Sequence, residues 1–144
     1  MTDEESRDLR AEAQMLRDML NSELGEPCNR SQSPDGSEWL EAGEPPEVVV
    51  RLDNESISVY RYQAGWDGPA HPYVRSQCLV TVFWSRMRVV ETLTLLASII
   101  DQERAARRAT FGKCRYCGRI NGPEHMHESD VCQSCAEKHL GVVY

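Results

Sequence analysis

The sequence predicts an α+β protein that runs from an N-terminal helix through a small antiparallel sheet and a long helix to a cysteine-rich C-terminal module. Three observations support this class. Apolar residues recur every three or four positions in two stretches, as they do on one face of a helix. Runs of β-branched and aromatic residues lie between those stretches and favour strands. Two CxxC pairs near the C-terminus have a spacing typical of a metal site.

Residues 1–24 predict an amphipathic helix. Between Ser6 and Leu24, apolar residues recur at intervals of three and four, which places them on one helical stripe. Acidic residues at the start of the chain suit the positive end of the helix dipole. Gly25 and Pro27 then end the helix.

Residues 25–46 predict a long acidic loop or linker. The stretch is dense in Gly, Pro, Ser and acidic residues, and Pro34 to Gly36 form a turn signal. Trp39 and Leu40 are its large apolar residues. We expect them to anchor the loop on the rest of the protein.

Residues 47–110 predict an α+β core of three strands and a long helix. The runs 47–52 and 56–63 flank a short polar turn, a pattern typical of a β-hairpin. A third strand is expected at 73–84, after a second turn-rich segment. Apolar residues return to helical spacing over 86–109, and the last two turns of this helix are basic.

The start of the chain and its longest apolar stretch indicate where the protein resides. MTDEESRDLR is acidic and has no apolar run after it, unlike a secretory signal, so we expect a cytoplasmic protein. The longest apolar stretch, 78–100, is interrupted by Arg86, Arg88 and Glu91. These charges would be costly in a bilayer, so we expect no membrane contact.

Residues 111–144 predict a zinc-binding module. Two CxxC pairs fourteen residues apart supply four thiols, from Cys114, Cys117, Cys132 and Cys135. This spacing is close to that of known zinc sites, and thiols stay reduced inside cells, so zinc is favoured over disulfides. An iron–sulfur cluster and a redox-active CxxC pair are the alternatives.

The context of the two pairs resembles a treble-clef zinc finger. Gly118 follows the first pair in a CxxCG knuckle, and CQSCAEKHLG (132–141) predicts a short helix that begins at the second pair. Over about thirty residues, CRYCGRI…CQSC is also similar to the zinc module of the DnaK-suppressor/TraR type of RNA-polymerase regulator. That resemblance implies a polymerase as partner.

The zinc ion is expected to be structural, because four cysteines fill every position of a tetrahedral ion and leave none for a substrate. We therefore predict no enzymatic activity, and we expect the nearby His125, His127 and His139 to be solvated or to lie behind the ligands. Two catalytic alternatives are weaker. One is an HNH-type nuclease that uses His125 and His127, and the other is a hydrolase built from Cys78 and His71. Cys78 is expected to be a small buried hydrophobe instead.

Charge along the chain predicts the mode of binding. The net charge is −7, with 13 acids against 4 cations in residues 1–47. Residues 104–119 hold six cations and no acid: Arg104, Arg107, Arg108, Lys113, Arg115 and Arg119. These cations are candidates for contacts with phosphate, or they offset the charge of the zinc thiolates.

The leading interpretation is a non-enzymatic zinc protein that acts by protein–protein interaction, as an adaptor, inhibitor or immunity-type protein does. Its acidic N-terminal third would then face a basic partner. The alternative is a nucleic-acid-binding or polymerase-associated transcriptional regulator that uses the basic helix end and the finger. The sequence does not predict the oligomeric state.

Overall fold

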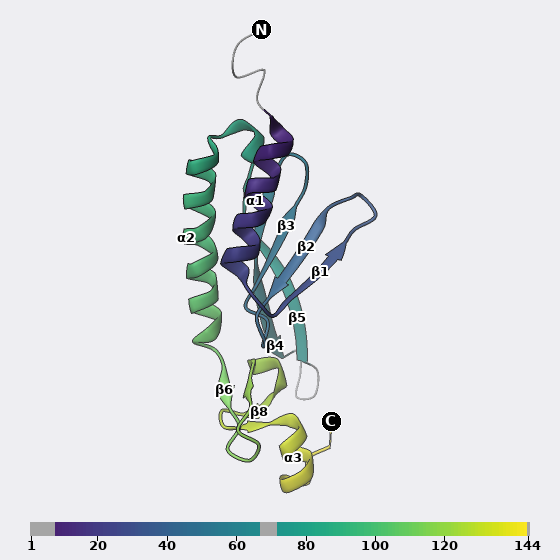
Figure 1. Ribbon diagram of the computed structural model, residues 1–144. Coiled ribbons are helices and arrows are strands. Elements are labelled where there is room, and N and C mark those ends of the chain that lie inside the picture. The colour runs from purple at the N-terminus through teal and green to yellow at the C-terminus, as the bar shows by residue number, and fades with distance from the viewer. Residues whose placement is uncertain (1–7, 67–71, 144) are drawn as a thin grey trace.

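The computed structural model describes residues 8–66 and 72–143, and its architecture is the expected α+β class (Figure 1). Two helices lie against one face of a five-stranded antiparallel sheet, and a small module follows the second helix. Among the described residues, none of the helices is long and apolar enough to cross a membrane.

The helix–sheet domain (residues 8–110) is a helix, a meander of strands in sequence order and a second helix. Its elements are α1 (Leu9–Leu24), β1 (Cys28–Gln32), β2 (Glu38–Ala42), β3 (Val48–Leu52), β4 (Ile57–Trp66), β5 (Pro72–Val82), the 3-10 turn η1 (Trp84–Arg86) and α2 (Val89–Arg108).

Helix α1 begins at Leu9, and residues 1–7 of the predicted range lie outside the described residues. The Asp8 carboxylate caps it by accepting hydrogen bonds from the backbone N–H groups of Arg10 and Ala11, at 3.1 and 3.2 Å. The predicted apolar stripe is confirmed for Leu16, Leu20 and Leu24, which are buried in the core with residues of the sheet.

The prediction of a loop over residues 25–46 is wrong, and the sheet has five strands instead of three. Strand β1 is polar and mostly exposed, so its sequence has no apolar alternation. Backbone pairing holds it to β2, with Arg30 opposite Leu40. Trp39 and Leu40 belong to β2, where Leu40 reaches the core. The Pro34–Gly36 turn signal lies between these two strands, where Asp35 accepts a hydrogen bond from the Ser37 backbone N–H.

The core of the helix–sheet domain lies between the helices and the sheet. Val48, Val50 and Leu52 alternate along β3 with residues of the opposite face, and Val50 pairs with Val59 of β4. Leu96 and Ile100 of α2 close the core from the helical side. The expected hairpin and long helix are therefore confirmed.

The four-cysteine module (residues 111–143) lies beyond the C-terminal end of α2 (Figure 1). It consists of two short hairpins and a helix. The elements are β6 (Gly112–Lys113), β7 (Ile120–Asn121), η2 (Pro123–His125), β8 (Met126–Glu128), β9 (Val131–Cys132) and α3 (Gln133–Leu140). Gly141 ends α3 in the left-handed conformation, with φ of 69°, where the sequence predicts the stop.

Candidate metal centre

Two knuckles bring the four cysteines together. Cys114 follows β6, and the chain turns back so that the backbone N–H of Gly118 donates to the Cys114 carbonyl at 2.9 Å. Gly118 has φ of 74°, a conformation that a residue with a Cβ rarely adopts. Cys132 ends β9, and Cys135 lies in the first turn of α3. Each pair therefore points both of its thiols toward the same space.

The four sulfur atoms fit one tetrahedral ion. All of them lie within 4.8 Å of one another, and Sγ of Cys117 is 3.9 Å from Sγ of Cys132. Zinc–sulfur bonds of about 2.3 Å require an edge of about 3.8 Å between ligands. Cys114, Cys132 and Cys135 are buried and Cys117 is exposed. The cluster can hold a metal ion, and its donors are the soft thiolates that zinc prefers.

The thiols differ in acidity, for reasons that the local geometry explains. Backbone N–H groups of Cys117 and Cys132 donate to the Cys114 sulfur and lower its pKa to about 6. Burial, together with hydrogen bonds from the neighbouring thiols, raises the pKa of Cys135 to about 12. Four thiolates therefore need a cation between them in order to coexist.

The histidines do not join the ligand cluster. Among the described residues, the convergent group at this site contains the four cysteines and no histidine. The His139 ring is stacked on Tyr116, with centroids 4.4 Å apart. His125 is exposed, and Nε2 of His127 lies 4.0 Å from the Glu128 carboxylate.

Two of the six candidate anion-binding cations bind Glu47 instead. Arg104 donates to the Glu47 carboxylate at 2.9 Å and also to the carbonyls of Glu23 and Leu24. Nη2 of Arg108 donates to Glu47 at 2.9 Å. Burial alone would raise the pKa of Glu47, but the hydrogen bonds from the two arginines outweigh it and lower the pKa. These cations therefore tie the end of α2 to α1 and the sheet.

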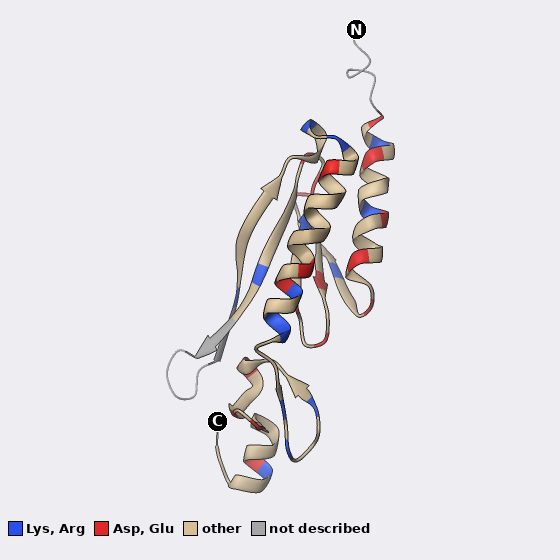
Figure 2. Ribbon diagram, turned by 90° about the vertical axis from the view of Figure 1, so that its left-hand side faces the viewer, with Lys and Arg blue, Asp and Glu red and all other residues tan. Residues whose placement is uncertain are grey.

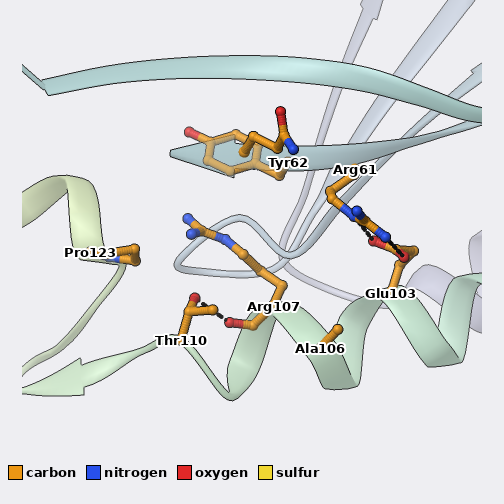
Figure 3. A pocket seen from close by; sticks show the side chains of 8 residues that line it. Arg61, Tyr62, Glu103, Ala106, Arg107, Thr110 and Pro123 are labelled. Atoms are coloured by element: carbon orange, nitrogen blue, oxygen red, sulfur yellow. Dashed lines mark hydrogen bonds and ion pairs between the residues drawn. The ribbon is translucent and has the colours of Figure 1, made fainter. Parts of the chain in front are cut away.

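A third candidate, Arg107, joins the helix–sheet domain to the four-cysteine module. It is 7% exposed, and its guanidinium donates to the Glu124 carboxylate of η2 at 2.7 Å and to the Pro46 carbonyl at 3.0 Å. The guanidinium also lies over the Tyr62 ring at 4.7 Å (Figure 3). Like Arg104, it is engaged inside the protein.

A cavity of about 370 Å³ opens beside Arg107, between β4, α2 and Pro123 (Figure 3). At one end Arg61 pairs with Glu103 at 3.0 Å, and at the other end Arg107 pairs with Glu124. Ala106 and Pro123 supply apolar lining. Both arginines therefore already have carboxylate partners.

The remaining three candidates lie on the β6–β7 hairpin and are exposed. Arg115 is 3.6 Å from the Asp130 carboxylate and lies over the Tyr116 ring at 5.0 Å. Neither Lys113 nor Arg119 has an ion-pair partner among the described residues. The six cations thus do not form one face: three hold the fold together, and three line the knuckle.

The acids of the N-terminal third also find partners within the protein. Asp35 pairs with Arg51 at 3.1 Å, and Glu38 lies 3.5 Å from Arg17. Together with buried Glu47, these contacts use a part of the acidic surface that was expected to face a partner.

Two residues important to the site escaped the sequence analysis. Glu124 is 2% exposed, and no pattern in the polar stretch around it indicates burial. Lys138 was treated only as part of the short helix, yet it lies beside the cysteine cluster with Arg119. Its position after CQSC in a helix was the available signal.

The catalytic alternatives gain no support from these residues. Cys78 is exposed on β5 at the edge of the sheet, so the expectation of a small buried hydrophobe is wrong. Strand β5 is an edge strand, and residues 75–78 on it are exposed. His71 lies outside the described residues.

No protein-family model matches the chain, and neither a curated protein nor a solved structure is significantly similar to it. The function proposed below therefore depends on the geometry of the chain itself.

Proposed function

We propose that the protein is a non-enzymatic binding protein whose C-terminal module is closed around a structural zinc ion. The observation that carries this proposal is the convergence of four thiols within 4.8 Å. Four sulfur ligands complete the coordination of zinc and leave no position for a reacting water. A knuckle, a hairpin and a helix that starts at the second pair also make a treble-clef-like order.

Metal content tests this proposal directly. Native mass spectrometry of the purified protein should find one zinc ion per chain, and Cys132→Ser should lose it. Cys78→Ser is the matched control, because Cys78 lies outside the cluster and should leave the metal content unchanged. A full-length protein with no bound metal, or a spectrum that reveals a water among the ligands, contradicts the proposal.

The leading mode of action is contact with a protein partner. Several apolar side chains of the small module face solvent, with Ile120 59%, Leu140 43% and Val143 89% exposed. Exposed apolar side chains on a module of this size favour a protein contact. The exposed acids that remain in the N-terminal third, such as Asp18 and Glu44, would favour a basic partner.

A matched pair of variants tests the protein contact. Ile120→Asp with Leu140→Asp should abolish co-purification of a specific partner, since charge is costly in a buried interface. Val90→Asp is the control, because Val90 is 73% exposed at the other end of the molecule. Equal losses with both variants would exclude the module as the contact surface.

The second candidate function, nucleic-acid binding, is favoured by one observation. Arg119 and Lys138 line the pocket at the cysteine cluster, Lys113 directly precedes Cys114, and none of the three has a carboxylate partner among the described residues. The arginines at the end of α2, which the sequence also offered for this role, are engaged with Glu47 and Glu124.

A further inference from the structure

We infer that the face of the four-cysteine module beside the metal ligands binds single-stranded nucleic acid, with a backbone phosphate in the polar pocket next to the cysteines and a base on the Tyr116–His139 stack. The site deepens the second candidate function. It rests on the metal-bound module of the proposed function and is independent of any protein partner.

The pocket is the first observation. A cavity of about 500 Å³ is lined by three of the four cysteines, Cys117, Cys132 and Cys135, and so adjoins the candidate metal site. Its other lining residues are all polar donors or cations: Arg119, Asn121, His125, Gln133, Ser134 and Lys138. No carboxylate lines it. An oxyanion in this pocket would meet the donors of Arg119, Ser134 and Lys138, whereas the side-chain amides of Asn121 and Gln133 already donate one hydrogen bond each to backbone carbonyls.

The charge of the metal centre decides whether an anion is attracted. Four thiolates around Zn²⁺ carry a net charge of about −2, which Arg119 and Lys138 offset when the ion is bound. Lys113 adds a further cation on the β6–β7 hairpin. It lies opposite Ile120, which follows Arg119 in the sequence. These three cations exceed the charge of the metal centre by about one, but the exposed Glu137 next to Lys138 cancels that excess, so a phosphate would be held by the hydrogen-bond donors more than by net charge.

The ring stack is the second, independent observation. Tyr116 and His139 lie parallel within 8°, with centroids 4.4 Å apart. Both are exposed, and they follow or precede pocket residues directly, Tyr116 before Cys117 and His139 after Lys138. The Arg115 guanidinium lies over Tyr116 at 5.0 Å. An exposed column of rings and a guanidinium is the platform on which unpaired bases stack.

Single strands fit this arrangement better than a duplex does. Stacking on a protein ring requires a base that is free of its neighbours, and a lone phosphate pocket beside a ring matches the alternation of base and phosphate along one strand. The negative charge of the whole chain does not prevent this. The β6–β7 hairpin bears Lys and Arg and no Asp or Glu (Figure 2).

The test measures binding of a labelled mixed-sequence oligonucleotide to the zinc-loaded protein by fluorescence anisotropy. Arg119→Gln with Lys138→Gln should weaken binding on the order of tenfold and make the slope of log affinity against log salt shallower, because fewer phosphates are neutralised. The matched control is Arg86→Gln with Arg88→Gln, which removes the same charge at the start of α2. This control should change the affinity less than about twofold.

The stack has a separate readout. His139→Ala should also weaken binding on the order of tenfold, but it should leave the salt dependence unchanged, because stacking releases no counterions. A merely structural role of the stack would appear as loss of zinc or of folded helix in this variant, which native mass spectrometry and circular dichroism measure.

Each remaining outcome overturns the inference. If the oligonucleotide does not bind at physiological salt while the protein retains one zinc ion, the site is wrong and the proposed structural zinc stands. If both charge variants weaken binding equally, the effect is general electrostatics. If the Arg119 and Lys138 variant loses zinc affinity and keeps the oligonucleotide, these cations only offset the thiolates. A phosphopeptide that binds in place of the oligonucleotide assigns the pocket to a protein partner.

Discussion

The two halves of the molecule are held together by different means. In the helix–sheet domain, fourteen described residues form one buried apolar cluster, contributed by both helices and four strands. In the four-cysteine module the buried cluster has six residues, and three of them, Cys114, Cys132 and Cys135, are cysteines of the candidate metal site. The first half has a core of its own, whereas the second replaces much of its core with sulfur ligands.

This difference indicates which half of the molecule depends on a metal ion in order to fold. A unit of about thirty residues cannot bury enough apolar surface to fold alone, so a metal ion must supply the missing free energy. The helix–sheet domain has no such need. The contact between the halves is polar, since Arg107 and Glu124 form a buried ion pair at their junction. Such a pair fixes orientation more than it adds stability.

The largest expected effect is that of removing the metal ion, which should unfold the four-cysteine module and not the helix–sheet domain. A chelator should unfold residues 112–143 and leave the sheet intact, because zinc binding contributes about 10 to 16 kcal/mol to small modules of this kind. Hydrogen exchange read by mass spectrometry should show protection lost in β8, β9 and α3 and retained in β2 to β4. Loss of protection throughout the chain would mean that the two halves fold as one unit.

A substitution in the core of the helix–sheet domain should destabilise that domain and leave the metal site intact. Leu96 is fully buried between α2 and the sheet, and Leu96→Ala should cost about 3 kcal/mol of unfolding free energy through the cavity it leaves. Leu95, its neighbour, is 41% exposed, and Leu95→Ala should cost less than about 0.5 kcal/mol. Urea unfolding measures both. Zinc content should be unchanged in either variant, and a loss of zinc from Leu96→Ala would show that the sheet supports the metal site.

The junction between the halves gives a smaller expected effect. A Cβ on Gly122 would lie 2.5 Å from both carboxylate oxygens of Glu124 and 2.7 Å from Nη2 of Arg107. Gly122→Ala should therefore separate this buried ion pair, at a cost of about 2 kcal/mol.

A double-mutant cycle isolates the cause of that loss. In a Glu124→Gln background, Gly122→Ala should cost measurably less, because the charged pair that it disrupts is already absent. Equal costs in the two backgrounds would show that the clash, and not the ion pair, determines the result.

The elements that the sequence predicted are those with a strong local pattern. Leucines at helical spacing predicted α1, and the two CxxC pairs predicted the four cysteines that the structure brings together. Strands β1 and β2 were missed because they lie in a stretch dense in Gly, Pro, Ser and acidic residues and β1 has no inward apolar row. Strand β2 pairs with β3, and β1 pairs with β2, and the apolar pattern along a single strand does not reveal such backbone pairing.

Partners distant in sequence also escaped the sequence analysis around the candidate metal site. The six cations near the cysteines looked like one basic surface, but the acids that bind three of them lie elsewhere in the chain. Glu47 is 57 to 61 residues away from Arg104 and Arg108, and Glu124 is 17 residues from Arg107. A charge count along the chain contains no information about such distant partners, so it overestimated the free positive charge.

The smallest expected effect is a dependence of the stability of the helix–sheet domain on pH. The folded protein lowers the pKa of Glu47 from its ordinary value of 4.5, because Arg108 and Arg104 hydrogen-bond to the carboxylate. A carboxyl group with a lowered pKa stabilises the fold above its unfolded pKa and loses that contribution as the pH falls through its folded pKa. The helix–sheet domain of the zinc-free protein should therefore lose stability on acidification below about pH 4.5.

Glu47→Gln separates this contribution from those of other carboxyl groups. The variant should be less stable than wild type at pH 7, since the partly buried Arg104 loses its charged partner, and the two proteins should converge as the pH falls. Urea unfolding at a series of pH values, followed by circular dichroism of the helices, measures the difference. If the difference in unfolding free energy between the two proteins stays constant across the pH range, Glu47 acts through packing. Its ion pairs with Arg104 and Arg108 then add no charge-dependent stability to the domain.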